Sequence, residues 1–537
     1  MKKSTIFIIL SSALVLTSCL DETAKDRLSE DQAYSSASSL YINAVASLYN
    51  YIGGDEESEG LQGTYRGVYD YNEITTDEAI IPIRGGDWYD GGYWQNLYTH
   101  NWDASNESLY NTWKYLYKVV VLCNESLEAL SSHGMLLTTE QYQAYCAEVR
   151  ALRAIYYYYI MDLWGNVPMA AETAKGTPAQ QYSRSKMFAF IWDELQECAP
   201  LLPDANSNQK NEYYGRVTRP VAYFVLAKLA LNAEVYTDDN WTDGTRPSGK
   251  DIVLSVGGTM MNAWDACITY CDKISTEGYT LATDYSANFA ILNESSPENI
   301  WTIPMDKTND TRQFKYLFRS RHYAHGGYLS SASENGTCAT IYACHIYGYG
   351  TDSVDTRWAK NFYSDTLKIN GNVVPQEDGT PLIYYPLAVE VNLTYSPYIL
   401  TAGARMNKYE TDFTAYNDGN DVDNDIVLFR YADVLLMKAE AEVRNGGNGD
   451  KELNLVRRRA GMPARTATLN NILQERLLEL CWEGWRRQDM IRFDRYHVSY
   501  DLRTAPAEEA DRHTIVFPIP QRALDLNTSL KQNSGYK

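Results

Sequence analysis

The chain has 537 residues, a formal net charge of −21 and a hydrophobic share of 45%. The hydrophobic share is enough for a large core, and the length allows one domain or several. The negative charge argues against binding to nucleic acid and to anionic lipid surfaces, and it suits a neutral ligand.

The first residues have the pattern of an export signal with lipid attachment. Two lysines precede an almost wholly apolar run at residues 5–16, and residues 16–19 read Leu-Thr-Ser-Cys. The run is too short to cross a bilayer as a helix, which takes roughly 20 residues. The small residues before the cysteine match the lipobox of bacterial lipoproteins. We therefore expect residues 1–18 to be removed as a signal peptide, Cys19 to carry lipid, and residues 19–28 to form a tether.

Helical periodicity of the apolar residues predicts a mostly α-helical protein. In chain order, helices are expected at residues 37–51, 109–130, 138–164, 183–200, 218–236, 262–274, 428–444, 453–459 and 471–487. Gly165 and Asn166 end the third of these helices, and Pro168 prevents its continuation. Successive antiparallel pairs with small residues at close approaches, such as Ala227 and Ala439, suggest tetratricopeptide-like stacking.

Residues 281–425 differ in composition from the sequence on either side. Glycine, serine, asparagine and tyrosine become more frequent, helical periodicity fades, and short strand-like runs such as residues 299–303 occur. A separate lectin-like domain is disfavoured, because no regular series of alternating strands is visible. We expect one domain over residues 29–537, in which a helical scaffold (residues 29–280 and 426–537) carries a loop-rich variable region.

Two pairs of side chains have the residue types of metal ligands but lack the neighbouring ligands that a metal site needs. Cys267 and Cys271 lie one helical turn apart, with no second pair or histidine cluster near them in the sequence. We expect these thiols, like the other cysteines beyond Cys19, to be buried and unreactive. His322 and His325 are expected to be solvated loop residues. The sequence therefore predicts no metal site.

Glu475, Glu479 and Glu483 are spaced four apart, with Arg486 and Arg487 following. Paired carboxylates are the machinery of glycoside hydrolysis, but this spacing places them on one face of a predicted helix. The expected role is ion pairing between packed helices.

Five separated motifs follow one another along the chain. They occupy residues 148–168, 215–236, 429–442 and 475–493, together with the closing Phe-Pro-Ile-Pro and Gln-Asn-Ser-Gly-Tyr at residues 517–520 and 532–536. In this order they resemble the SusD/RagB family of Bacteroidetes outer-membrane lipoproteins. The resemblance implies tetratricopeptide-like helix pairs (a SusD-like α-α superhelix) beneath a variable, loop-rich ligand face.

The same resemblance implies a partner and a location. The partner is a SusC-like TonB-dependent transporter, to which the lipoprotein delivers oligosaccharide. Asp21 and Glu22, which follow Cys19, resemble the surface-export signal used in that phylum. The resemblance thus places the protein on the outer face of the outer membrane, held there by its lipid.

Residues 83–95, termed the glycine-rich loop, have the chemistry of a glycan site. Aromatic rings cover the apolar faces of a sugar, and Asp, Asn, Gln and Arg side chains bond its hydroxyls. The glycines disfavour helix and strand, so we expect the side chains of this loop to project. The candidate contacts are Trp88 and Tyr89, with Asp87 and Arg84 as polar groups, and with Tyr93 and Trp94 either in contact or packed beneath the loop.

Residues 65–78 resemble an element of starch-binding family members, in which the arginine of a Tyr-Arg pair bonds the glycan. That correspondence makes Arg66 a further polar candidate. An acidic ligand residue precedes the arginine in those members, and Asp55 or Glu59 is the candidate for it. The aromatic residues that follow the element match only if an insertion after Glu78 is allowed.

The variable region is expected to supply a second wall of the site. Its tyrosine-rich segments are residues 321–328 and 342–349. The candidates on them are Tyr323, Tyr328 and Tyr342.

The leading functional hypothesis is capture of an oligosaccharide or polysaccharide for uptake, without catalysis and without a cofactor. Uptake of peptides is the alternative, because RagB-type relatives use a similar scaffold. A lipid-anchored glycoside hydrolase is disfavoured. The sequence contains no recognisable Ser/His/Asp arrangement, metal cluster or phosphate loop, and no carboxylate pair in an evident aromatic cleft.

Overall fold

The computed structural model describes residues 33–171, 176–309, 315–416, 419 and 421–536. The signal peptide, Cys19 and the tether lie outside the described residues. The structure is 46% helix and 10% strand, which confirms the predicted mostly α-helical class. Across the described ranges, no helix combines the length and the apolar character needed to cross a bilayer.

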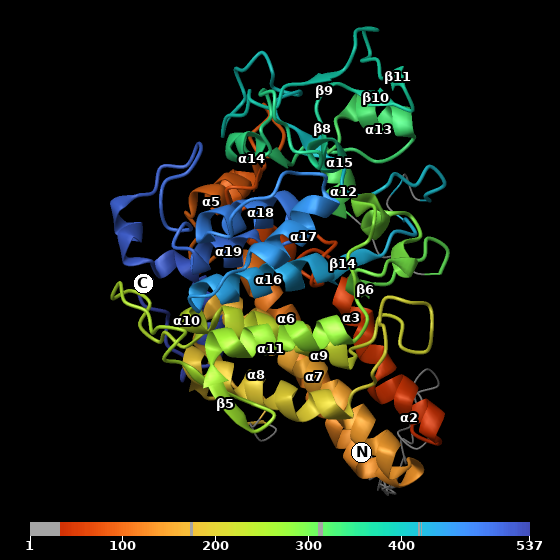
Figure 1. The fold of residues 1–537 in the computed structure, drawn as a ribbon, viewed down its shortest axis with the longest axis vertical. Coiled ribbons are helices and arrows are strands. Elements are labelled where there is room, and N and C mark those ends of the chain that lie inside the picture. The colour runs from red at the N-terminus through yellow and green to blue at the C-terminus, as the bar shows by residue number, and fades with distance from the viewer. Residues whose placement is uncertain (1–32, 172–175, 310–314, 417–418, 420, 537) are drawn as a thin grey trace, which may run out of the picture.

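Long helices form the body of the molecule, and shorter ones connect or cap them (Figure 1). In chain order they are α2 (Ala37–Ala44), α3 (Asn50–Gly53), α4 (Val68–Glu73), α5 (Tyr93–Thr99), α6 (Glu107–His133), α7 (Thr139–Trp164), α8 (Arg184–Cys198), α9 (Arg219–Leu231), α10 (Ala233–Tyr236), α11 (Ala263–Thr276), α12 (Lys315–Arg319), α13 (Tyr323–Leu329), α14 (Ile341–Ile346), α15 (Trp358–Asn361), α16 (Tyr431–Arg444), α17 (Asp450–Arg459), α18 (Leu469–Leu480), α19 (Arg486–Arg492) and α20 (Gln521–Leu526).

The long helices pack in series. Helix α6 contacts α7, α7 contacts α8, α8 contacts α9, α9 contacts α11, and α11 contacts α16. Helix α7, the second of this series, is buried along its second half, which joins the main hydrophobic core. Its ends agree with the sequence signals. Thr138 caps it through a reciprocal bond with Gln141, and Gly165 ends it at a φ of 67°.

The strands form two-stranded antiparallel sheets, as expected for small sheets within a helical scaffold. The pairs are β1 (Ala79–Ile80) with β7 (Cys338–Ala339), β2 (Val167–Pro168) with β3 (Gln181–Tyr182), β4 (Val253–Val256) with β5 (Thr259–Asn262), β6 (Asn299–Ile303) with β14 (Ile426–Arg430), β8 (Phe362–Tyr363) with β13 (Arg405–Met406), β9 (Asp365–Thr366) with β12 (Ile383–Tyr384), and β10 (Lys368–Ile369) with β11 (Asn372–Val373).

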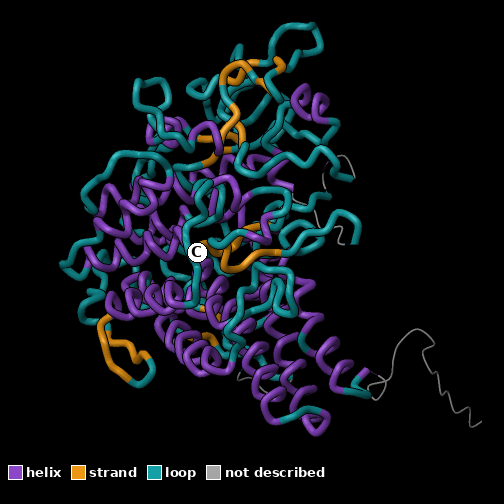
Figure 2. Tube along the Cα trace, turned by 45° about the vertical axis from the view of Figure 1, so that its right-hand side comes forward, coloured by secondary structure: helices purple, strands orange, loops and turns teal. Residues whose placement is uncertain are grey.

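Much of the loop-rich region gathers at one end of the molecule. Figure 1 shows β8 to β11, α13 and α14 at the top, above the layer of α16 to α19, with α7, α8 and α9 below. Figure 2 shows the same division, with loops and several strands at the top and helices in the lower half. The pair β6–β14 lies lower, fully buried, and joins the two parts.

Four predicted helices differ from the structure. The helix expected at 37–51 is divided into α2, a 3-10 turn and α3, and the helix expected at 218–236 is divided into α9 and α10. The helix expected at 428–444 starts only at Tyr431, because the residues before it pair with β6 as strand β14. The helix expected at 471–487 is broken after Leu480. Trp482 and Gly484 have φ of 66° and 76°, and their backbone N–H groups donate to the carboxylates of Glu78 and Glu73. These long-range bonds hold the break open.

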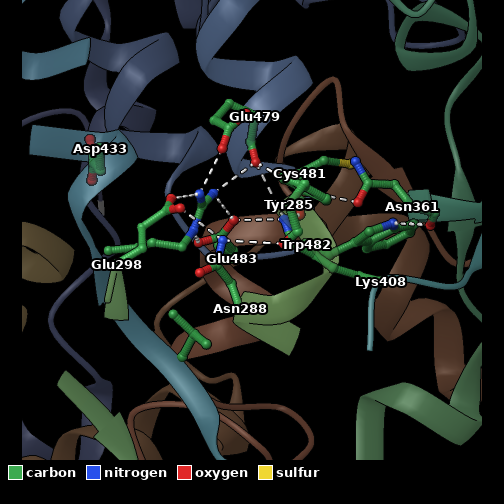
Figure 3. Close-up of polar contacts among 12 residues, drawn as sticks. Tyr285, Asn288, Glu298, Asn361, Lys408, Asp433, Glu479, Cys481, Trp482 and Glu483 are labelled. Atoms are coloured by element: carbon green, nitrogen blue, oxygen red, sulfur yellow. Dashed lines mark hydrogen bonds and ion pairs between the residues drawn. The ribbon is translucent and has the colours of Figure 1, made fainter. Parts of the chain in front are cut away.

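A buried network of ion pairs ties the loop-rich region to the C-terminal helices (Figure 3). Arg430 donates to Glu298 at 2.5 Å, to Glu479 at 2.6 Å and to Glu483 at 2.7 Å. Acidic and basic side chains are equal in number, namely Glu298, Asp355, Glu475, Glu479 and Glu483 with Arg357, Lys408, Arg430, Arg457 and Arg459.

This network confirms the ion-pairing role expected for Glu475 and Glu479. Burial works to raise the pKa of Glu479, but the guanidiniums of Arg459, Arg430 and Arg357 outweigh it and hold this pKa below its ordinary value. The prediction was wrong about geometry, because Glu483 lies beyond the end of α18. Arg486 and Arg487 also pair elsewhere, with Asp77 and Asp162.

Candidate functional site

A cavity of about 670 Å³ opens between α13 and the loop at 375–378, and we call it the α13 cavity. Its lining combines exposed aromatic rings with small polar and acidic groups: His322, Tyr323, Ala324, Gly327, Tyr328, Pro375, Gln376, Glu377, Asp378 and Leu400. The volume falls in the range of small-molecule sites. Two of the tyrosines predicted for the second wall, Tyr323 and Tyr328, are thus brought together.

Helix α13 presents these two tyrosines to solvent. Each side chain is 43% exposed. His322 caps this helix, because its Nδ1 accepts a hydrogen bond from the backbone N–H of Ala324 at 3.0 Å. Gly326 packs so closely that a Cβ there would lie 2.4 Å from Ser333. The capped, tightly packed helix is a rigid support for the rings.

The glycine-rich loop reaches α13 through Asp87. The Tyr323 hydroxyl donates to Asp87 Oδ2 at 2.8 Å, although the two residues are 236 positions apart. Burial, and then this bond to Asp87, raise the pKa of Tyr323 to about 12, so the phenol is a donor at neutral pH. Tyr89, on the same loop, is 56% exposed. Asp87 and Tyr89 therefore stay candidates for ligand contact.

Trp88 is half-buried and anchored rather than free. Its Nε1 donates to the Glu334 carbonyl at 2.8 Å, and a Cβ on Gly336 would lie 2.6 Å from its ring. The residue also has a φ of 63°, a left-handed backbone conformation that is uncommon outside glycine. Several neighbours together hold Trp88 in this position. The ring keeps partial exposure, so it remains a candidate contact with a second, structural role.

Arg66 stabilises the glycine-rich loop through contacts with three of its residues. Its guanidinium pairs with Glu57 at 2.7 Å and Asp90 at 2.8 Å, and it lies over the rings of Tyr93 and Trp94 at 5.4 and 5.6 Å. Its upstream acidic partner is Glu57, whereas Asp55 and Glu59, the candidates for an acidic ligand residue, form no ion pair with Arg66 among the described residues, and Glu59 lies 3.8 Å from Lys118. Arg66 does not line the α13 cavity, and each of its terminal nitrogens already donates to a carboxylate.

Two candidate contacts, Trp94 and Arg84, are buried, and for Trp94 this is the packing beneath the loop that the sequence left open. Trp94 is 1% exposed, since α5 starts at Tyr93 and turns the next ring into the core. Arg84 is 2% exposed and donates to the carbonyls of Ile399 at 2.8 Å and Ala402 at 2.9 Å. Tyr93 is half-buried between Arg66 and Trp94, which leaves little of its ring for a ligand.

Tyr342 does not join the others. It lies on α14, half-buried against the main core, while α13 lies on the other side of the loop-rich end (Figure 1). Burial raises the pKa of its phenol, and Asp77 adds to that shift. The structure gives Tyr342 no place in the α13 cavity.

His322 and His325 are buried, which corrects the expectation that they are solvated loop residues. His322 is 6% exposed and His325 is fully covered beneath Tyr384, whose hydroxyl lies 3.1 Å from His325 Nδ1. Burial, Arg405 and Arg84 lower the pKa of His322 to about 4, so its ring is neutral at pH 7. Among the residues that the structure describes, no group of three or more His, Cys, Asp or Glu is arranged to hold a metal ion.

The described cysteines are free thiols, and all are buried except the half-buried Cys146. Burial raises the pKa of the Cys123 and Cys198 thiols to about 12, which keeps them in the unreactive protonated form. The expectation of buried thiols is confirmed for the described cysteines other than Cys146.

Sequence reasoning missed the far wall of the cavity. Gln376, Glu377 and Asp378 lie in a segment without aromatic residues, so no local signal marks them as neighbours of α13. Leu400 follows Tyr395 and Tyr398, a tyrosine signal that the prediction did not use. A second cavity, of about 500 Å³ and mostly apolar, lies between α6 and α20 and contains none of the predicted site residues.

Two family models match this chain. One, described as the SusD family, matches residues 400–536, and another, described as "Starch-binding associating with outer membrane", matches residues 58–231. The fold defines a class of protein that is mostly helical and has a loop-rich end. That end carries a cavity lined by aromatic residues. The two family-model matches, together with the curated SusD relatives, confirm the resemblance to the SusD/RagB family seen in the motifs.

Curated relatives cover nearly the whole chain. It is 23% identical to the starch-binding protein SusD of Bacteroides thetaiotaomicron, over 90% of this chain and 88% of that one. It is 25% identical to a SusD-like protein of Bacteroides ovatus, over 92% of this chain and 83% of the relative.

Solved structures show the same fold. Surface glycan-binding protein A from Bacteroides thetaiotaomicron, in complex with laminarihexaose, superimposes with a TM-score of 0.68 at 22% identity, over 93% of this chain and 100% of that one. A laminarin binding SusD-like protein gives a TM-score of 0.68 at 19% identity, over 93% and 100% of the two chains. At these identities the likeness establishes the fold alone.

Proposed function

We propose that this protein binds an oligosaccharide or polysaccharide at the α13 cavity and the adjoining glycine-rich loop, without cleaving it. The observation that carries the proposal is the exposed pair Tyr323 and Tyr328 beside a cavity that also offers Gln376 and Asp378. Rings of this kind cover the C–H faces of a sugar, and amides and carboxylates bond its hydroxyls. The names of the relatives, which refer to starch, laminarin and surface glycans, support the same ligand class.

The carboxylates around the cavity argue for binding rather than hydrolysis. Asp87, Glu377 and Asp378 lie at exposed positions. A glycosidase needs one carboxylic acid held protonated by apolar surroundings and a second carboxylate opposite it. Exposed carboxylates instead serve as hydrogen-bond acceptors for neutral hydroxyls.

The proposal extends to the cell envelope. We propose that Cys19 carries lipid, that this lipid holds the protein at the outer face of the outer membrane, and that a SusC-like TonB-dependent transporter receives the glycan. The family description that mentions association with the outer membrane supports this placement. The lipobox at residues 16–19 supports the anchor.

Affinity electrophoresis tests glycan binding directly. Purified residues 20–537 are run in native gels that contain starch or laminarin, the polysaccharides named for the relatives. We expect retardation in at least one of them and no release of reducing sugar during long incubation. Hydrolysis by the pure protein would overturn the non-catalytic proposal, and free migration in every polysaccharide tried would overturn glycan binding.

Point variants test the location of the site. Tyr323→Ala and Tyr89→Ala should each remove most of the retardation, because both rings are exposed and reach no deep core. The matched control is Phe413→Ala, whose ring is 59% exposed but lies outside the cavity lining. Equal retardation of all three variants would place the glycan elsewhere.

The anchor and the transporter are tested in cells. Cys19→Ala should leave binding of the purified protein unchanged and abolish retention at the cell surface. Wild-type protein extracted from outer membranes in mild detergent should co-purify with a TonB-dependent transporter. Surface retention of the variant would refute the lipid anchor, and purification without a transporter would refute the partner.

A further inference from the structure

Two tyrosines that lie beyond the α13 cavity form an aromatic pair of their own. The rings of Tyr385 and Tyr398 are 4.5 Å apart between centroids and tilted by 44°, and each side chain keeps 37% of its surface exposed. Neither hydroxyl makes a hydrogen bond recorded among the described residues. The pair thus offers both apolar ring surface and free polar tips, which suits a surface that meets a ligand.

The pair lies close to the cavity along the chain. Leu400 lines the α13 cavity and is itself 37% exposed. Tyr398 lies two residues before it, so their Cα atoms are at most about 7 Å apart. Tyr385 is joined to the same turn by bonds with Thr401 and Gly403 at 3.0 and 2.9 Å. A chain that leaves the cavity over Leu400 meets this pair next.

The turn that carries the pair is held by two buried arginines. Arg84 donates to the carbonyls of Ile399 and Ala402, and Arg405 donates to the carbonyl of Leu400 at 3.0 Å. Buried guanidiniums bonded to three carbonyls of one turn leave that turn little freedom. The rings are therefore presented in a fixed geometry, which reduces the entropy lost on binding.

We propose that Tyr385 and Tyr398 form a second glycan platform, reached from the α13 cavity over Leu400, so that the protein is built for an extended chain. This inference rests on the proposed glycan-binding function. A disaccharide in the cavity does not reach the platform, whereas a hexasaccharide occupies both. The platform consequently selects for chain length.

The test compares short and long probes in the full-length mature protein. The probes are laminaribiose and laminarihexaose, and maltose and maltohexaose, measured by calorimetry or, for weak binding, by NMR titration. Tyr398→Ala and Tyr385→Ala should each weaken hexasaccharide binding about tenfold and leave disaccharide binding unchanged. Unchanged disaccharide binding also shows that the variants are folded.

The same loop provides the matched control. Tyr395 is 98% exposed and makes no ring contact recorded among the described residues, so Tyr395→Ala should bind both lengths as the wild type does. Hexasaccharide binding that survives both platform variants while Tyr323→Ala abolishes it would overturn the platform and leave the proposed function standing. Equal losses for both lengths would also overturn it, because they would mean that the variants act through the cavity. No binding of any probe by the wild type would count against the proposed function itself.

Discussion

The helical body and the loop-rich end of this protein use charged residues in opposite ways. In the body, Arg430 and its partners are buried, and each charge meets opposite charges at hydrogen-bond distance. At the loop-rich end, Glu377 and Asp378 lie at the rim of a cavity, exposed and without a cation recorded against them. Buried charges need partners, which are opposite charges around Arg430 and backbone carbonyls for Arg84 and Arg405, whereas exposed carboxylates remain available to a ligand.

The two regions are nevertheless joined by the buried ion-pair network. Glu298, Arg357 and Lys408 belong to the loop-rich sequence, yet Glu298 accepts from Arg459, Arg357 donates to Glu479, and Lys408 donates to Glu483. The network therefore attaches the loop-rich region to the helical body. The loops can vary in sequence and conformation only in the part that lies beyond the network. A variant in the network should affect stability, and a variant in the cavity should affect binding.

The largest effect is expected from Arg430→Met. This change leaves three buried carboxylates without their shared cation, and breaking a buried pair in this way costs about 3–5 kcal/mol. The free energy of unfolding, measured with urea, should fall by that amount. Lys360→Met is the control, since its pair with Asp284 is exposed and contributes at most about 1 kcal/mol. Similar losses for both variants would contradict the distinction between the two kinds of charge.

Gly336→Ala should have the next largest effect. Its new methyl group would lie 2.6 Å from the Trp88 ring, which is rigid and bonded to Glu334, so the ring must move. Overpacking of this kind costs about 1–3 kcal/mol, and glycan affinity should fall with it. Gly86→Ala is the matched control in the glycine-rich loop, because a Cβ there meets nothing within 4 Å. Unchanged affinity in Gly336→Ala would remove Trp88 from the site.

Helices were predictable because their signals are local. Thr138 and Asn262 cap α7 and α11, and the apolar periodicity between cap and stop is visible in the sequence. The break at Trp482 was not predictable, because it depends on carboxylates about four hundred positions away, Glu73 and Glu78. A local sequence pattern cannot predict a hydrogen bond between residues that lie so far apart in the chain.

The residue types of the site were predictable from the sequence, but their arrangement in space was not. Tyr323, Tyr328, Asp87 and Tyr89 have the residue types of a glycan site and are exposed or line the cavity. Which loop residues point inward depends on where α5 begins, and Gly92, at a φ of 87°, starts that helix immediately before the two aromatic residues. The burial of Arg84 depends on the distant turn at 399–402, which no nearby sequence reveals.

A pH effect should follow from His322. Its pKa of about 4 in the folded protein lies below the ordinary value of 6.5, because of burial and then the charges of Arg405 and Arg84. Between pH 6.5 and 4 the unfolded chain takes up a proton that the folded protein does not. Stability should therefore fall as the pH is lowered through this window, by up to about 1.4 kcal/mol per pH unit from this residue.

His322→Asn isolates that contribution. Asparagine still accepts a hydrogen bond at the start of α13, so the helix stays capped, but it does not titrate. The slope of unfolding free energy against pH should be shallower in the variant between pH 6.5 and 4 and parallel to the wild type above this window. Parallel curves throughout would show that His322 is protonated as easily in the folded protein as in the unfolded chain.

The smallest effect is expected from Tyr323→Phe, which removes the 2.8 Å bond to Asp87 and keeps the ring. If that bond orients the ring toward the glycan, affinity should fall by about twofold to tenfold, the range of a single hydrogen bond, while stability stays within about 0.5 kcal/mol. A double-mutant cycle with Asp87→Ala separates orientation from direct contact. The combined variant should be no weaker than Asp87→Ala alone, because the two changes remove the same bond. Additive losses would mean that Asp87 and the Tyr323 hydroxyl each bond the glycan independently, and the contact between the loop and α13 would then be incidental to binding.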